Sequence, residues 1–303
     1  MATTIVTKYG SDAPATTDIV RGELAVDTEN GRLYTENSSG AIVEIGLKPE
    51  ADVTLATGAD LITASAGTSN VRFGVNAGNS IASGGNYNVV VGDEAGTAIT
   101  TGDGNVFTGY ASGDALTLGS SNTAIGRDSL GADTIGNHSV AIGRNALTTQ
   151  NFTSATDAYN TAVGSSAGTA VTTGVQNTLI GGLAGDGITT GSANVALGYN
   201  SLSAAGGGNG SIAIGKNALA AQNASGDRIN TAVGLSAGLS VTTGIQNTLI
   251  GGLAGDAITT GSYNSLVGVN AGGALTTGAQ NVAFGQGALA TNTTGSTNTA
   301  LGD

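Results

Sequence analysis

The chain lacks residue types on which several classes of protein depend. It has no cysteine and no tryptophan, and only one histidine and one methionine among 303 residues. The absence of cysteine excludes disulfide frameworks, thiolate metal sites and thiol nucleophiles. Charged residues make up 10% of the chain, well below the ~25% of an average globular domain. This composition is typical of a repetitive fibrous protein and unusual for an enzyme.

Basic residues and long apolar runs are also scarce. Nine Lys and Arg stand against 21 Asp and Glu, a formal net charge of −12, so the chain has no general attraction to nucleic-acid phosphates or anionic membranes. No segment approaches the ~18–20 apolar residues of a membrane span. Residues 1–8 lack the basic and apolar regions of a secretory signal. We therefore expect a soluble protein, made in the cytoplasm, with no nucleic-acid partner and no membrane insertion.

Charge divides the sequence into two parts. Residues 1–60 hold 10 of the 21 acidic and 4 of the 9 basic residues, and the glycine-rich remainder is nearly uncharged. Residues 1–46 contain three short β-forming segments separated by loops that end in glycine, which hairpin loops favour. These segments are 23–27, 32–36 and 41–45. The pattern predicts a three-stranded meander in residues 1–46, followed by a linker at 47–69.

From residue 70 onward, an internal repeat dominates the sequence. The pattern Asn-(Val/Thr)-x-apolar-Gly recurs fourteen times, and ten of the thirteen intervals between its closing glycines have the same length, as from Gly92 to Gly109. The three longer intervals end at Gly92, Gly164 and Gly234, and thus recur at every fourth repeat. The closing glycines are Gly74, Gly92, Gly109, Gly126, Gly143, Gly164, Gly181, Gly198, Gly215, Gly234, Gly251, Gly268, Gly285 and Gly302. Such regularity predicts a repeat architecture over 70–303.

The repeat positions, counted from the closing glycine, predict a parallel β-solenoid. Position −3 is almost always β-branched and position −1 almost always apolar, which together favour a strand. The rest of each repeat gives the chain room to return and pair in parallel, and this return can include a shorter strand near the Ala or Ser at position +3. Stacked Asn at position −4 would form an amide ladder. We expect an all-β fold of about fourteen 17-residue coils, with a narrow interior that favours self-association.

Two segments resemble known families. Residues 138–147 and 210–219 are similar to the head repeats of trimeric autotransporter adhesins, which implies a left-handed parallel β-roll and a homotrimer. Residues 21–34 resemble the opening module of bacteriophage tail fibres and tropism determinants, which often forms a trimeric β-prism that docks on the virion. Together the resemblances imply a non-enzymatic virion fibre of a bacteriophage. Its partners would be other virion proteins, bound through residues 1–46, and a host surface receptor.

The sequence gives less support to several other functions. A capsid-associated fibre or decoration protein and a bacterial adhesin remain alternatives to a tail fibre. A polysaccharide depolymerase would need paired carboxylates ~5–9.5 Å apart, whereas Asp114, Asp186 and Asp256 recur every four repeats, ~19 Å apart at ~4.8 Å per coil. An ice-binding face would need two outward threonine columns, and the Thr-Thr-Gly pattern offers one. Its members are Thr100, Thr172, Thr189, Thr242, Thr259 and Thr276.

The sequence therefore predicts no catalytic, cofactor-binding or metal-binding residue. His138 has no partner constellation near it, and 102–104 and 206–210 only approach a calcium-binding glycine pattern. The insertions at 150–159 and 222–229 could contact a receptor, or relieve strain between groups of four repeats. They carry the candidate contact residues Phe152, Tyr159 and Arg228. Because the last repeat ends as a complete strand motif, we expect a continuation beyond Asp303 or a covering protein.

Overall fold

A computed structural model describes residues 24–27, 32–36, 42–45, 65–204 and 206–302. The chain forms two compact units, Met1–Leu61 and Ile62–Asp303. In the first unit, β1 (Leu24–Asp27), β2 (Arg32–Glu36) and β3 (Ile42–Ile45) pair antiparallel in sequence order, which confirms the three predicted strands. The loops between these strands lie outside the described residues, as does most of the predicted linker.

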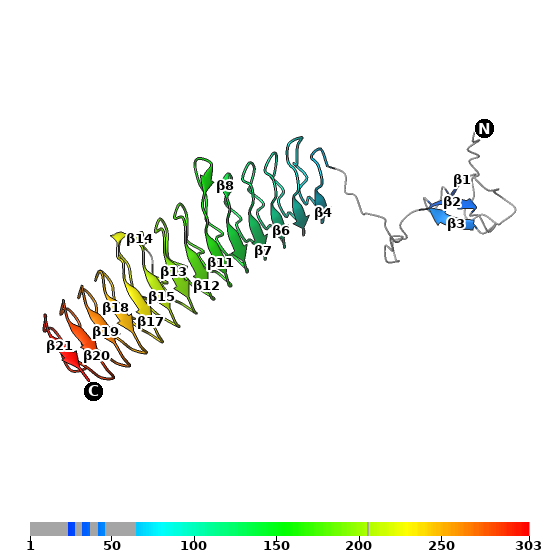
Figure 1. The fold of residues 1–303 in the computed structure, drawn as a ribbon. Coiled ribbons are helices and arrows are strands. Elements are labelled where there is room, and N and C mark those ends of the chain that lie inside the picture. Colours follow the sequence, from blue (N-terminus) through cyan, green and yellow to red (C-terminus); the bar gives the residue numbers. More distant parts are fainter. Residues whose placement is uncertain (1–23, 28–31, 37–41, 46–64, 205, 303) are drawn as a thin grey trace. The chain divides into compact units, whose positions relative to one another are not determined.

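The second unit is a parallel β-solenoid with one long sheet (Figure 1). Each coil contributes one three-residue strand, and neighbouring strands pair in parallel without a register shift. The fourteen strands are β4 (Val71–Phe73), β5 (Val89–Val91), β6 (Val106–Thr108), β7 (Thr123–Ile125), β9 (Val140–Ile142), β11 (Thr161–Val163), β12 (Thr178–Ile180), β13 (Val195–Leu197), β15 (Ile212–Ile214), β17 (Thr231–Val233), β18 (Thr248–Ile250), β19 (Ser265–Val267), β20 (Val282–Phe284) and β21 (Thr299–Leu301). The predicted fold class is confirmed.

The closing glycine is fixed by the close approach of adjacent coils. Gly92 has φ of 133° and Gly109 has φ of 130°, a region that side chains other than glycine rarely adopt. A Cβ added to Gly92 would lie 2.6 Å from the carbonyl oxygen of Gly109 in the next coil. Both the backbone conformation and the space therefore require glycine at this position.

The shorter strand for which the sequence left room near position +3 does not form in the described coils. The residues after the closing glycine form a turn, from +1 to +6 in most coils and from +1 to +4 after Gly126 and Gly198, and positions +2 and +4 have positive φ in successive coils. In one coil, Asp128 (φ 57°) and Leu130 (φ 52°) flank the buried Ser129 at position +3. Left-handed residues on both sides of position +3 prevent the extended backbone that a strand needs.

The core lies inside the thin coil, between the strand and the returning segment. Positions −4, −2, +3 and +7 face inward and are mostly fully buried, whereas positions −3 and −1 face outward. Inward-facing and outward-facing positions thus alternate along the strand with a period of two residues. The interior is less narrow than predicted because position −2 carries Val, Leu or Phe in several coils. Position +7 carries Ile, Leu or Val in most coils and the buried polar residues Asp133, Gln150 and Gln222 in three others.

Side-chain volume is shared between positions −2 and +4. Phe107 at position −2 is matched by Gly113 at position +4, where an added Cβ would lie 2.5 Å from the Phe107 ring. In the next coil the pair is reversed, with Ala124 at −2 and Leu130 at +4, both fully buried. In these two coils, one large side chain from either position therefore fills the same part of the interior.

A ladder of buried asparagine side chains runs along the solenoid, as predicted. The Asn105 Nδ2 donates to Asn88 Oδ1 (3.0 Å) and to the Gly119 carbonyl (2.9 Å), and the Asn105 backbone N–H donates to Asn88 Oδ1 (2.9 Å). The Asn105 Oδ1 accepts the same two bonds from Asn122. Each amide is fully satisfied in the core, which is the condition for burying it without loss of stability.

Candidate functional site

One candidate interaction surface is the outward face of the fourteen-stranded sheet, which we call the strand face (positions −3 and −1 of each coil). Large apolar side chains along it are 36–84% exposed. They are Phe73, Ile125, Ile180, Leu197, Ile212, Ile250, Val282, Phe284 and Leu301. Position −1 is apolar in every coil except that of Thr108, and a long row of exposed apolar side chains is typical of a binding surface.

Exposed aromatic residues flank the strand face at two positions. Tyr87, Tyr159 and Tyr263 occupy position −5, and each is more than half exposed with a positive φ near 50–60°. Tyr110 and Tyr199 occupy position +1 and are 52% and 54% exposed. These rings widen the apolar surface beyond the strands.

The insertion at 150–159 repairs a break in the asparagine ladder. Ser139 replaces Asn at position −4, and its side chain is too short to supply the missing amide. Instead the Asn160 Nδ2 donates to Gln150 Oε1 (2.9 Å), and the Gln150 Nε2 donates to Ser139 Oγ (2.9 Å). The Gln150 Nε2 also donates to the buried Asp133 carboxylate (2.7 Å). The insertion thus has a structural role that the sequence analysis did not identify.

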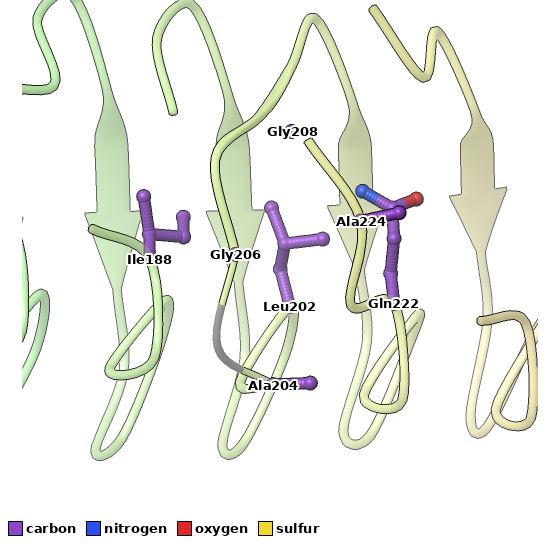
Figure 2. Close-up of a pocket in the computed structure, with 7 residues that line it drawn as sticks. All are labelled: Ile188, Leu202, Ala204, Gly206, Gly208, Gln222 and Ala224. Atoms are coloured by element: carbon purple, nitrogen blue, oxygen red, sulfur yellow. The ribbon is translucent and has the colours of Figure 1, made fainter. Parts of the chain in front are cut away.

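The second insertion repeats this repair. Asn230 Nδ2 donates to Gln222 Oε1 (2.8 Å), and Gln222 Nε2 donates to Ser211 Oγ (3.0 Å). Beside Gln222 lies a cavity of about 10 Å³, whose lining comes from three successive coils (Figure 2). The lining residues are Ile188, Leu202, Ala204, Gly206, Gly208, Gln222 and Ala224. This volume is close to the minimum for one water molecule and leaves no room for a larger ligand.

Each insertion also adds a pair of two-residue strands at the coil edge. β8 (Gly136–Asn137) pairs with β10 (Thr156–Asp157), and β14 (Gly208–Asn209) pairs with β16 (Gly226–Asp227), both in parallel. In each pair the Asn side chain donates to the Asp carboxylate, at 3.2 Å and 3.1 Å.

The first insertion brings His138 into a surface cluster. The His138 Nδ1 lies 3.3 Å from the Asp157 carboxylate, and its ring stacks on Tyr159 with a centroid distance of 5.1 Å. Phe152, by contrast, is 5% exposed and belongs to the interior. Arg228 of the second insertion donates to the Thr243 carbonyl (3.1 Å) and to carbonyls of its own loop. Of the candidate contact residues, Tyr159 is therefore the one presented as an exposed ring.

The three recurring aspartates occupy equivalent turns four coils apart. Partial burial raises the pKa of Asp114, Asp186 and Asp256 above the usual 3.8, opposed by backbone N–H donors in the same turn. Nearby Asp128 and Glu94 add to the increase in the pKa of Asp114. One oxygen each of Asp186 and Asp256 is buried without a hydrogen-bond partner. The structure does not bring these carboxylates together as an acid/base pair within the chain.

The threonines of the Thr-Thr-Gly pattern are part of the coil wall. Thr100, Thr172 and Thr242 donate from Oγ1 to the carbonyl of the equivalent threonine in the next coil, at 3.0–3.2 Å. Among the described residues, no three His, Asp or Glu side chains are placed to hold a metal ion. The described part of the chain also contains no helix with the length and hydropathy needed to cross a membrane.

The fold and these surfaces define a parallel β-solenoid repeat protein with a long apolar strand face. No protein family, curated protein or solved structure matches the chain.

Proposed function

We propose that the protein is a non-enzymatic structural fibre of a bacteriophage virion, assembled from three copies and linking the particle to the host surface. The solenoid would be the shaft, and residues 1–46 would dock on other virion proteins. The resemblance of residues 21–34 to fibre-docking modules supports the attachment role. The strand face, with its row of exposed apolar side chains at position −1, is the observation that carries the proposal.

The dimensions of the strand face support self-association. Thirteen steps between fourteen strands, at ~4.8 Å each, give a length of roughly 60 Å, and a width of about 10 Å then gives an area on the order of 600 Å². The flanking tyrosines enlarge it. Specific interfaces bury about 800 Å² per partner, so this face alone approaches the area that a stable assembly needs. Three copies packed around one axis would cover it along its whole length.

Virion location is the test of this function. Purified phage particles would be analysed by mass spectrometry and by immuno-electron microscopy with one antibody against residues 1–46 and another against the solenoid. The proposal expects the protein in the particle, with the first antibody near the tail and the second farther from it. Label on the head would instead identify a capsid fibre or decoration protein. Absence from particles, with the protein on bacterial cells, would overturn the virion role in favour of an adhesin.

A further inference from the structure

We infer that residues 160–229 form an exchangeable length unit of the solenoid: four coils whose removal or repetition leaves a continuous shaft. The inference goes beyond the proposed function and does not depend on where the protein is located. It rests on the equivalence of the two ends of this unit, which can be compared contact by contact.

The hydrogen bonds at the two ends match. At the first end, Asn160 Nδ2 donates to Gln150 Oε1 at 2.9 Å, and at the second end Asn230 Nδ2 donates to Gln222 Oε1 at 2.8 Å. Each asparagine also donates to a glycine carbonyl, Gly174 at 2.7 Å and Gly244 at 2.8 Å. If residues 160–229 were removed, Gln150 would meet Asn230 in the geometry that it now has with Asn160.

The backbone joins also match. The Val140 N–H donates to the Asn160 carbonyl and the Ile212 N–H donates to the Asn230 carbonyl, both at 2.8 Å. The residues that would be exchanged at the join, Tyr159 and Ile229, have nearly the same φ, 48° and 50°. A chain that passes from Tyr159 directly to Asn230 therefore needs no new backbone conformation.

Core packing at the two ends is the same to within the precision of the distances. A Cβ placed on Gly168 would lie 2.7 Å from Leu179, 2.9 Å from Leu147 and 3.3 Å from Val171. The equivalent atom on Gly238 would lie 2.7 Å from Leu249, 2.9 Å from Leu219 and 3.3 Å from Val241. Leu147 could therefore pack against Gly238 in the shortened chain as Leu219 now does.

The ladder restricts where such a join can occur. Ser139 and Ser211 are tolerated at position −4 because the insertion in the same coil carries Gln150 or Gln222. A plain coil placed directly after Ser211 would leave the next asparagine without an amide acceptor in the core. Coils can therefore be exchanged only in groups that keep each serine together with the insertion that carries its glutamine.

Two deletion variants of the full chain test this inference. The first lacks residues 160–229, the whole four-coil unit, and keeps the phase of the ladder. The second lacks only residues 212–230, a single coil, which joins Ser211 to Thr231 and removes Gln222 together with Asn230. The second variant keeps the strand sequence in step, but Asn247 then follows Ser211 with no amide acceptor.

The larger deletion should be the milder one. We expect the first variant to unfold in a single transition within about 5 °C of the parent chain and to form a shaft shorter by about 19 Å, four steps of ~4.8 Å, in electron micrographs. The second should melt at a lower temperature than the first and lose hydrogen-exchange protection around Asn247. A first variant that aggregates, or that melts below the second, would overturn the inference. Repetition of residues 160–229 should lengthen the shaft by the same ~19 Å.

Discussion

At the scale of single residues, most coils of the solenoid place one large side chain at either position −2 or position +4; the coils of Gly164 and Gly234 have Ala and Gly there. The coil with Phe107 has Gly113, and the following coil has Ala124 with Leu130 at a positive φ of 52°. A leucine in the left-handed region is unfavourable by itself, and burial of its side chain offsets that strain. The repeat thus has two interchangeable ways of filling one coil.

A double substitution should convert one arrangement into the other. Phe107→Ala alone leaves a cavity and should lower the free energy of unfolding by about 3–5 kcal/mol. Gly113→Leu alone should prevent native packing, because its Cβ would lie 2.5 Å from the Phe107 ring. The double variant, which reproduces Ala124 and Leu130, should recover most of the loss in denaturant titrations. Additive losses would show that the two positions do not share one volume.

Aspartates in the turns should make the solenoid less stable when they are ionised. Burial raises the pKa of Asp186 and Asp256 above 3.8, so the folded state binds a proton more readily than the unfolded state. Stability gained from this difference is complete below about pH 3.8 and is lost as the pH rises through the elevated folded-state pKa.

Replacement of both carboxylates should therefore stabilise the protein at neutral pH. Asp186→Asn with Asp256→Asn should raise the free energy of unfolding at pH 7 by less than about 1 kcal/mol, because solvent screens these partly exposed groups. The gain should disappear near pH 3, where the parent carboxyls are protonated. Thermal melts of both proteins at the two pH values give the comparison. A destabilised variant at pH 7 would show that the ionised carboxylates make favourable contacts in the turn.

At the scale of elements, the strands and their faces could be predicted because each repeat alternates with period two. The asparagine ladder followed from one residue type recurring at one position. The turn after the closing glycine did carry a local signal, because position +4 is often Gly and position +2 often Asn or Asp, residues that favour positive φ. Leu at position +4 and Ala, Ser or Leu at position +2 in other coils obscured that signal. Volume sharing did have a signal, the alternation of Gly and Leu at position +4, but its meaning requires knowing that position −2 faces the same space.

Repair of the ladder had a sequence signal as well. Ser139 and Ser211 are each followed by a glutamine at the same spacing, Gln150 and Gln222. Only the three-dimensional path of the longer coil shows that this glutamine returns to the asparagine column. The contact of His138 with Asp157 and Tyr159 depends on the same path, which explains why it could not be predicted from residue spacing.

Removal of the bridging glutamine should destabilise the solenoid locally. Gln222→Ala leaves the Ser211 hydroxyl and one N–H of the buried Asn230 amide without their partner, at a cost of about 1–3 kcal/mol for each unsatisfied group. Gln246→Ala is the matched control, since that side chain is exposed. Hydrogen exchange should show lost protection around Asn230 only in the first variant. Equal behaviour of the two variants would argue against a bridging role.

At the scale of the whole molecule, the strand face should determine the state of association. Ile180→Glu and Ile250→Glu place charges on outward side chains that are 36% and 39% exposed in the single chain. In an assembly these carboxylates would be buried together near the axis, at high electrostatic and desolvation cost. The double variant should be a folded monomer by light scattering and circular dichroism, whereas the parent chain should have a trimer mass.

A control separates this effect from a general effect of added charge. Thr173 lies on the opposite, returning side of the coil and is exposed, so Thr173→Glu adds a charge away from the strand face. It should leave the trimer mass unchanged. A parent chain that is monomeric at micromolar concentration, or a strand-face variant that stays trimeric, would contradict assembly through this surface.

The direction of the hydrogen bonds between coils has a mechanical consequence. Strands lie across the solenoid axis, and the bonds that join them run along it, so tension applied between the ends of a single solenoid loads these bonds in series. Coils should then detach one after another, each 17-residue coil releasing about 55–60 Å of chain. The two coils that carry the insertions at 150–159 and 222–229 should give two longer steps, which single-molecule force spectroscopy would resolve. Release of the entire chain in one event would show instead that the coils bear tension together. A solenoid that unfolds coil by coil extends gradually under load and absorbs work over its whole length.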